Sequence, residues 1–217
     1  MPPPKLCGVI FDLDGTLADT LPLAITAFRR AIEPLTGRTL ADAEIIAQFG
    51  PSEEGVIRVL APDHYDAALA GYLRHYEALH DMVPEPFPEM RELLTDLKAR
   101  GVRLGMVTGK GARSAEFSLR RFGLEDAFEA VETGDPTGPR KVEGIRRILA
   151  GWGLHPTEAV YVGDAPSDVT AAREAGVAMI GAAWAETTDR DLLAAEKPDA
   201  LLATVGELRD WLISRVQ

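Results

Sequence analysis

Residues 8–20 read GVIFDLDGTLADT, and the first four of them are apolar enough to form a buried strand. Two carboxylates, Asp12 and Asp14, come directly after this apolar run, and Gly15 follows them. A single acid there could cap the next helix, but two acids so close together repel each other unless a cation joins them. The stretch therefore predicts a charged site at the end of a buried strand.

The rest of the chain alternates between short β-rich runs and stretches with helical periodicity. We expect strands at residues 6–11, 102–107, 128–131, 159–162, 178–180 and 200–202. Between them, helices are expected at residues 88–100, 112–122, 142–152 and 166–175, each followed directly by a glycine. This alternation is typical of an α/β fold, and it predicts a Rossmann-like doubly wound parallel sheet covered by helices.

One interval breaks the alternation, because about 90 residues separate the first two expected strands and a single crossover needs far fewer. The interval has helical periodicity at residues 21–35, 41–48, 53–60 and 64–80. We therefore expect an all-helical insertion at residues 19–85, placed within an α/β core formed by residues 1–18 and 86–217. The short connecting segments at the two ends of the insertion could act as hinges.

Composition excludes several classes of protein. The chain has 217 residues, 46% of them hydrophobic, and a formal net charge of −11, which argues against nucleic acid or an anionic membrane as the main partner. The N-terminal residues contain no long apolar segment, so we expect a cytoplasmic protein without a secretory signal. The single cysteine, Cys7, excludes a disulfide within the chain. The sequence leaves open whether the protein is a monomer or a homodimer.

Polar residues gather where the expected strands end. Asp12 and Asp14 follow the first strand, Thr108, Gly109 and Lys110 follow the second, and Asp164 and Asp168 follow the fourth. The carboxyl ends of parallel strands meet at one edge of the sheet, where ligands bind. Several carboxylates with few histidines are a ligand set suited to Mg²⁺, which binds through one or two carboxylates, water and phosphate.

These motifs, taken in order, resemble the haloacid dehalogenase superfamily. The resemblance is carried by DLDGT after the first strand, by the threonine of VTGK after the second, by a lysine, and by GDAPSD after the fourth. The DLDGT form resembles the phosphatase branch, and the helical insertion resembles a cap of the C1 type. The segments VTGK, YVGDAPSD and FGPSEEG look most like phosphoglycolate phosphatases and their inorganic-pyrophosphatase relatives.

The resemblance implies a role for each of these residues. Asp12 would be the nucleophile that forms an aspartyl-phosphate, and Asp14 would protonate the leaving oxygen and then activate water. The resemblance also implies two binding sites. Mg²⁺ would be held by Asp12, the backbone carbonyl of Asp14, Asp164 and Asp168. Phosphate would be bound by Thr108, Gly109 and Lys141.

Some of these assignments have competing interpretations. The related phosphatases usually have a proline-rich segment after the lysine, whereas this chain reads GPRKVEGI, so Arg140 is the alternative to Lys141. Asp168 could bind metal directly, through a water, or serve only to hold Lys141. Thr108 could simply cap a helix. Ser52 could contact the substrate from the cap or act only as a helix N-cap.

The expected activity is Mg²⁺-dependent hydrolysis of a small phosphomonoester, most like that of a phosphoglycolate phosphatase. An inorganic pyrophosphatase, or a phosphatase of sugar phosphates or nucleotides, is the alternative within the same group. A phosphomutase remains a further alternative. Asp14 counts against a haloacid dehalogenase, because that reaction does not need an acid there. A non-catalytic binding protein would have no use for so many clustered carboxylates.

Overall fold

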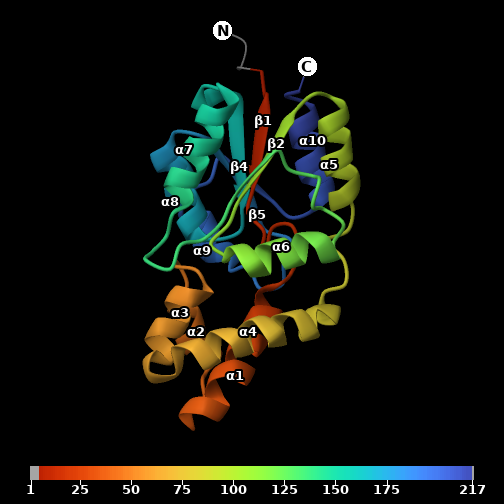
Figure 1. Ribbon diagram of the computed structural model, residues 1–217. Helices are drawn as coiled ribbons and strands as arrows, with labels where there is room; N and C mark the ends of the chain where they lie inside the picture. The colour runs from red at the N-terminus through yellow and green to blue at the C-terminus, as the bar shows by residue number, and fades with distance from the viewer. Residues whose placement is uncertain (1–4, 217) are drawn as a thin grey trace.

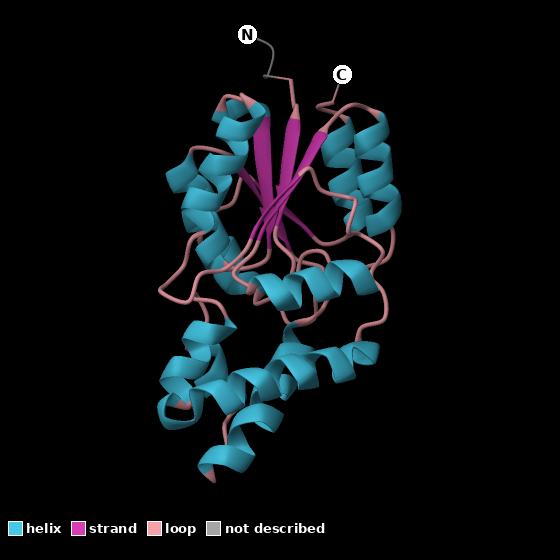
Figure 2. Ribbon diagram, viewed as in Figure 1, coloured by secondary structure: helices cyan, strands magenta, loops and turns pink. Residues whose placement is uncertain are grey.

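A computed structural model describes residues 5–216 and contains a central sheet flanked by helices, with a separate helical layer at one end (Figures 1 and 2). The sheet has six strands in the order β3-β2-β1-β4-β5-β6, and every neighbouring pair is parallel. The strands are β1 (Gly8–Phe11), β2 (Arg103–Val107), β3 (Ala130–Glu132), β4 (Ala159–Gly163), β5 (Ala178–Ala182) and β6 (Ala200–Leu202). This is the expected α/β fold.

The register of the three middle strands determines where the site lies. Strand β1 is fully buried and pairs with β2 on one side and β4 on the other, with Phe11 opposite Met106 and Val162. The three strands therefore end at almost the same level. The residues that follow them, including Asp12, are delivered to one edge of the sheet.

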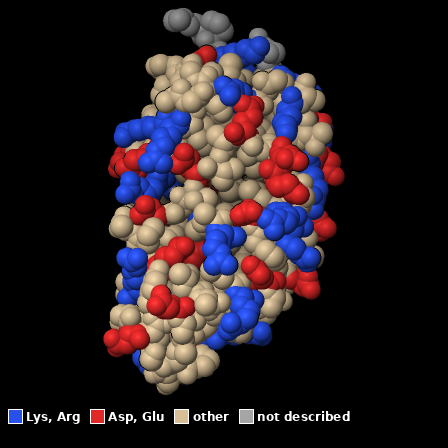
Figure 3. All heavy atoms as spheres, viewed as in Figure 1, with Lys and Arg blue, Asp and Glu red and all other residues tan. Residues whose placement is uncertain are grey.

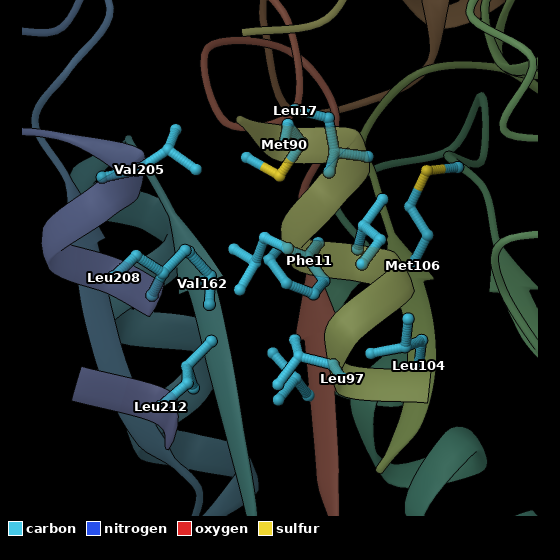
Figure 4. Packing of buried hydrophobic residues seen from close by; sticks show 14 of the residues in the cluster. Phe11, Leu17, Met90, Leu97, Leu104, Met106, Val162, Val205, Leu208 and Leu212 are labelled. Carbon is cyan, nitrogen blue, oxygen red and sulfur yellow. The ribbon is translucent and has the colours of Figure 1, made fainter. Parts of the chain in front are cut away.

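Helices cover both faces of the sheet (Figure 1). One face packs on α5 and α10 through a cluster that includes Phe11, Met90, Leu97 and Leu208, as Figure 4 shows. The other face packs on α7 and α8 through a cluster that includes Tyr161. The core helices are α5 (Met90–Ala99), α6 (Ala112–Arg121), α7 (Lys141–Trp152), α8 (Pro166–Ala175), α9 (Arg190–Ala195) and α10 (Val205–Ile213).

The layer at the end of the molecule has its own hydrophobic cluster, which includes Phe28, Ile57 and Tyr72. Its α-helices are α1 (Leu21–Thr36), α2 (Asp42–Ile46), α3 (Glu53–Leu60) and α4 (Tyr65–Leu79), with the 3-10 turns η1 (Pro62–His64) and η2 (His80–Met82). Helix α1 ends where Gly37 adopts a left-handed conformation, a common helix stop. We call residues 21–82 the cap helices.

The elements differ from the predicted ones mainly at their boundaries. The third strand starts two residues later than expected, at Ala130, and Phe128 packs against Phe11 in the core, with 6.4 Å between ring centroids. The expected helix at residues 41–48 shortens to α2, and α9 and α10 were not predicted.

No helix within residues 5–216 is both long and apolar enough to cross a bilayer. Acidic and basic side chains are interspersed over the face drawn in Figure 3.

Candidate active site

The loop after β1 presents two carboxylates in different surroundings. Asp12 is buried, and its Oδ1 accepts a hydrogen bond from the backbone N–H of Leu13 at 2.6 Å. The side chain of Asp14 is 27% exposed, and its Oδ1 accepts a hydrogen bond from the hydroxyl of Thr20, the residue directly before α1. One carboxylate is thus held rigidly inside the core, whereas the other faces the boundary with the cap helices.

Lys141 lies beside Asp12 and joins two core elements. Its Nζ is 2.5 Å from Asp12 Oδ2 and 2.5 Å from Asp168 Oδ1. Asp168 is fully buried, and it also accepts hydrogen bonds from the Tyr161 hydroxyl at 3.2 Å and the Ala165 N–H at 3.0 Å. Burial disfavours the charged ammonium, but the two carboxylates outweigh it and raise the pKa of Lys141 above its ordinary value.

Arg140, the alternative cation, takes a different position. Its side chain is 46% exposed and lies 3.9 Å from Asp135 Oδ2. Within the described residues, 5–216, the cation that contacts Asp12 is therefore Lys141 and not Arg140. A lysine in the first turn of a helix is otherwise unfavourable, and here the buried carboxylates compensate for it.

Asp164 completes a group of three carboxylates with Asp12 and Asp168, whose ligand oxygens all lie within 4.8 Å of one another. Burial raises the pKa of Asp12 to about 6, because its effect outweighs the opposing effect of the charge on Lys141. Burial and the neighbouring acids also raise the pKa of Asp164. Three acids with one lysine leave an excess of negative charge, so the donor set fits a divalent cation with oxygen ligands. Asp168 already accepts three hydrogen bonds from the protein, which favours an indirect role for it.

The loop after β2 brings Thr108, Gly109 and Lys110 to the same edge of the sheet. Thr108 is buried, and its Oγ1 accepts a hydrogen bond from the backbone N–H of Lys110 at 3.2 Å. Lys110 turns its buried ammonium toward Asp14, with 3.2 Å between Nζ and Oδ1. Burial disfavours the charge of Lys110, but Asp14 and nearby tyrosines raise its pKa well above the ordinary value. Sequence reasoning gave Lys110 no role.

The cap helices contact the core close to this loop. The backbone N–H of Ser52 donates to the carbonyl of Asp135 at 3.0 Å, while its hydroxyl donates to Glu54. Ser52 precedes α3 without capping it through its side chain. Its neighbour Glu53 is buried and accepts hydrogen bonds from the Gly111 N–H at 2.6 Å and from the Ser114 hydroxyl. Glu53 therefore joins the cap to the N-terminus of α6, a contact that the sequence did not reveal.

Gly15 allows the chain to turn sharply away from the acids. Its φ is +72°, and an added Cβ would lie 2.1 Å from Asp164 Oδ2. We expect Gly15→Ala to destabilise the fold by at least about 3 kcal/mol, from left-handed strain plus overpacking, and to abolish activity by displacing Asp164. Urea denaturation measures the first effect.

Gly37→Ala is the matched control for Gly15→Ala. Gly37 has a φ of +67°, but nothing lies within 4 Å of the position of an added Cβ. This variant should lose only about 1–2 kcal/mol, from backbone strain alone, and should keep its activity. Equal losses in the two variants would contradict the account of the contact with Asp164.

The order of these residues along the chain and their common edge define a known class of enzyme. Residues 9–182 match the model of the haloacid dehalogenase-like hydrolase family, and the chain belongs to that family. Its relatives include proteins named as phosphatases, and the chain is a phosphatase of this family.

The relatives with the clearest names fall into two groups. The chain is 32% identical over 204 residues to a phosphoglycolate phosphatase from Synechococcus elongatus, covering 93% of this chain and 94% of the relative. It is 30% identical over 206 residues to a putative pyrophosphatase PpaX from Caldanaerobacter subterraneus, covering 94% of this chain and 93% of the relative. The relatives of this chain thus differ in the substrates for which they are named.

Solved structures support the same fold. A haloacid dehalogenase-like protein from Streptococcus pneumoniae superposes with a TM-score of 0.77 at 26% identity, covering 95% of this chain and 98% of that one. CbbY from Rhodobacter sphaeroides, solved with xylulose-1,5-bisphosphate, gives a TM-score of 0.80 at 22% identity, covering 94% and 96% of the two chains. At that identity, the likeness to CbbY shows the fold alone.

Proposed function

We propose that the protein hydrolyses a small phosphomonoester through an aspartyl-phosphate on Asp12. The observation that carries the proposal is that Lys141 contacts both Asp12 and Asp168. Asp164 lies beside these two acids, whereas Asp14 is not part of this group. A carboxylate that attacks a phosphate dianion must overcome charge repulsion, which nearby cations and N–H donors offset. The proposed phosphate-binding groups are Thr108, Gly109 and Lys141.

Each residue has a defined task in the two half-reactions. An oxygen of Asp12 forms a bond to phosphorus while the bond from phosphorus to the leaving oxygen breaks, and Asp14 gives its proton to that oxygen. In the second half-reaction, water attacks the phosphorus of the aspartyl-phosphate and Asp14 takes a proton from it. The bond from phosphorus to Asp12 then breaks and releases inorganic phosphate. Lys141 keeps its proton and stabilises the charge on the phosphoryl oxygens.

The proposed cofactor is Mg²⁺, held by Asp12, Asp164 and the backbone carbonyl of Asp14. When bound, the cation neutralises charge on the phosphoryl oxygens and on the acids. Asp168 is assigned the task of holding Lys141, because its oxygens already accept hydrogen bonds from Lys141, Tyr161 and Ala165. Phosphatases of this family generally use a divalent metal, and its identity here is part of the proposal.

The proposed substrate is a small phosphorylated metabolite, with phosphoglycolate the first candidate and pyrophosphate the second. The relatives named for these two substrates support the choice. The cap helices make hydrogen bonds to the core at Ser52 and Glu53, so the cap lies next to the loop that follows β2. We place the reaction in the cytoplasm and leave the choice between monomer and homodimer open.

A phosphate-release panel tests the proposed function. Purified protein with Mg²⁺ is incubated with phosphoglycolate, pyrophosphate, sugar phosphates, nucleotides and p-nitrophenyl phosphate. We expect release of inorganic phosphate from at least one small metabolite, its loss in EDTA and its return with added Mg²⁺. Product that keeps the phosphoryl group would indicate a phosphomutase, and no release from any compound would contradict the proposal.

Metal binding should weaken as the pH falls. The pKa of Asp12 is raised to about 6, so below that pH a proton must leave before the carboxylate can act as a ligand. We expect the apparent Kd for Mg²⁺ to rise at least about tenfold from pH 7 to pH 5, as one displaced proton requires. Isothermal titration calorimetry measures this change. A Kd that does not vary between the two pH values would contradict the involvement of Asp12.

A further inference from the structure

Lys110 is a buried cation that the proposed reaction does not use. Its side chain is only 3% exposed, and the residue lies in the loop between β2 and α6. Burial of an unpaired ammonium is costly, so its surroundings must compensate for the lost hydration. Lys141 already serves Asp12 and the phosphoryl group, which means that Lys110 requires a separate explanation.

Two groups from different parts of the molecule surround the ammonium. Its Nζ is 3.2 Å from Asp14 Oδ1 in the core and 4.4 Å from the ring centroid of Tyr76 in α4 of the cap. The ring of Tyr76 is fully buried, and its hydroxyl is 2.8 Å from Ser118 Oγ in α6. The position of Lys110 is therefore fixed only when α4 lies against the core, as it does here.

The two oxygens of Asp14 are not equivalent. Oδ1 accepts from Thr20 and lies next to Lys110, whereas Oδ2 has no hydrogen bond to any of residues 5–216. The hydrogen bond from Thr20 and the ion pair with Lys110 both hold Oδ1, and they leave the other oxygen free. Because Asp14 is partly exposed, the free Oδ2 is the atom that can exchange a proton with the leaving group.

We propose that Lys110 is a positioning residue that orients the carboxyl group of Asp14 for proton transfer when the cap is seated on the core. This inference rests on the proposed function, in which Asp14 protonates the leaving oxygen. Lys110 keeps its own proton throughout. The proton moves from Asp14 Oδ2 to the leaving oxygen as the bond from that oxygen to phosphorus breaks. Tyr76 holds the ammonium in place from the cap side.

A series of aryl phosphates separates positioning of the acid from binding of the substrate. The compounds 4-nitrophenyl, phenyl and 4-methoxyphenyl phosphate carry the same charge. The basicity of their leaving groups increases in that order, so their cleavage depends increasingly on protonation of the leaving oxygen. Values of kcat/KM report the steps up to the first bond cleavage. They are measured with Mg²⁺ for the wild type, for Lys110→Met and Lys110→Arg, and for Lys98→Met, an exposed lysine that serves as the control.

We expect the defect of Lys110→Met to grow along the series. The loss in kcat/KM should be below about 3-fold with 4-nitrophenyl phosphate and at least about tenfold with 4-methoxyphenyl phosphate, because general acid catalysis contributes 10²–10⁴-fold. Lys110→Arg should recover part of the difference, and Lys98→Met should match the wild type. Retained turnover of 4-nitrophenyl phosphate also shows that the variant is folded.

Two other outcomes would overturn the inference. An equal loss with all three compounds would mean that Lys110 binds the substrate or only supports the fold, and no loss at all would mean that Asp14 is oriented without it. Failure of the proposed function is distinguishable from both, since the wild type would then not release phosphate.

Discussion

Asp12→Asn should abolish turnover while the protein remains folded. The amide is nearly the same size as the carboxylate, but it is a poor nucleophile and cannot form the acyl phosphate. We expect kcat to fall by at least about 10⁴-fold, as loss of a nucleophile does in other covalent enzymes. Release of p-nitrophenol in the presence of Mg²⁺ measures the effect.

The fold of this variant needs a separate check. Lys141 loses the charge of one partner but keeps Asp168, so the thermal unfolding midpoint should change little. Asp63→Asn, at an exposed position in η1 of the cap, is the matched control and should keep full activity. Turnover by purified Asp12→Asn within a factor of ten of the wild type would rule out the nucleophile assignment.

Lys141→Met should produce the second large loss. Lys141 lies between two buried acids, so its removal takes away the cation that offsets their charge beside the phosphoryl group. We expect kcat/KM to fall at least about 100-fold, the size typical of one lost electrostatic donor. Steady-state kinetics with p-nitrophenyl phosphate and the best metabolite measures the effect.

The neighbouring residue provides the control for Lys141. Arg140 is half exposed and paired only loosely with Asp135, so Arg140→Met should change kcat/KM by less than about 3-fold. A larger loss in the Arg140 variant than in the Lys141 variant would show that the arginine is the phosphate-neutralising cation. The two variants thus decide whether Lys141 or Arg140 neutralises the phosphate, which the sequence left open.

The architecture of the core could be predicted because its signals are local. Each strand is a short apolar run, and most of the covering helices end at a glycine, so the alternation predicts a parallel sheet. Asp12, Thr108 and Asp164 each follow a strand of that sheet, so their common position at one edge could also be predicted. The third strand begins at Ala130 and not at residue 128, and the ring of Phe128 packs on Phe11. Helices α9 and α10 lie in a stretch for which no helix was predicted.

The contacts between the cap and the core could not be predicted in the same way. Helical periodicity gives the buried face of α4, but not the angle at which that face meets the core. The approach of Tyr76 to Lys110 and the bond from Glu53 to Gly111 both depend on this angle. One signal was available for Lys110, since a lysine in the short loop after a buried strand is seldom buried without a charged partner.

The aspartyl-phosphate on Asp12 is the central claim, and the Asp14→Asn variant tests it most directly. Without Asp14 as a base, the second half-reaction should stall, while p-nitrophenolate can still leave unprotonated in the first. Rapid mixing with p-nitrophenyl phosphate and Mg²⁺, followed by acid quench and peptide mass spectrometry, should give a burst of one p-nitrophenolate per chain and a phosphoryl group on Asp12. A phosphoryl group on another residue, or slow turnover without a burst and without phosphorylated peptide, would contradict the account.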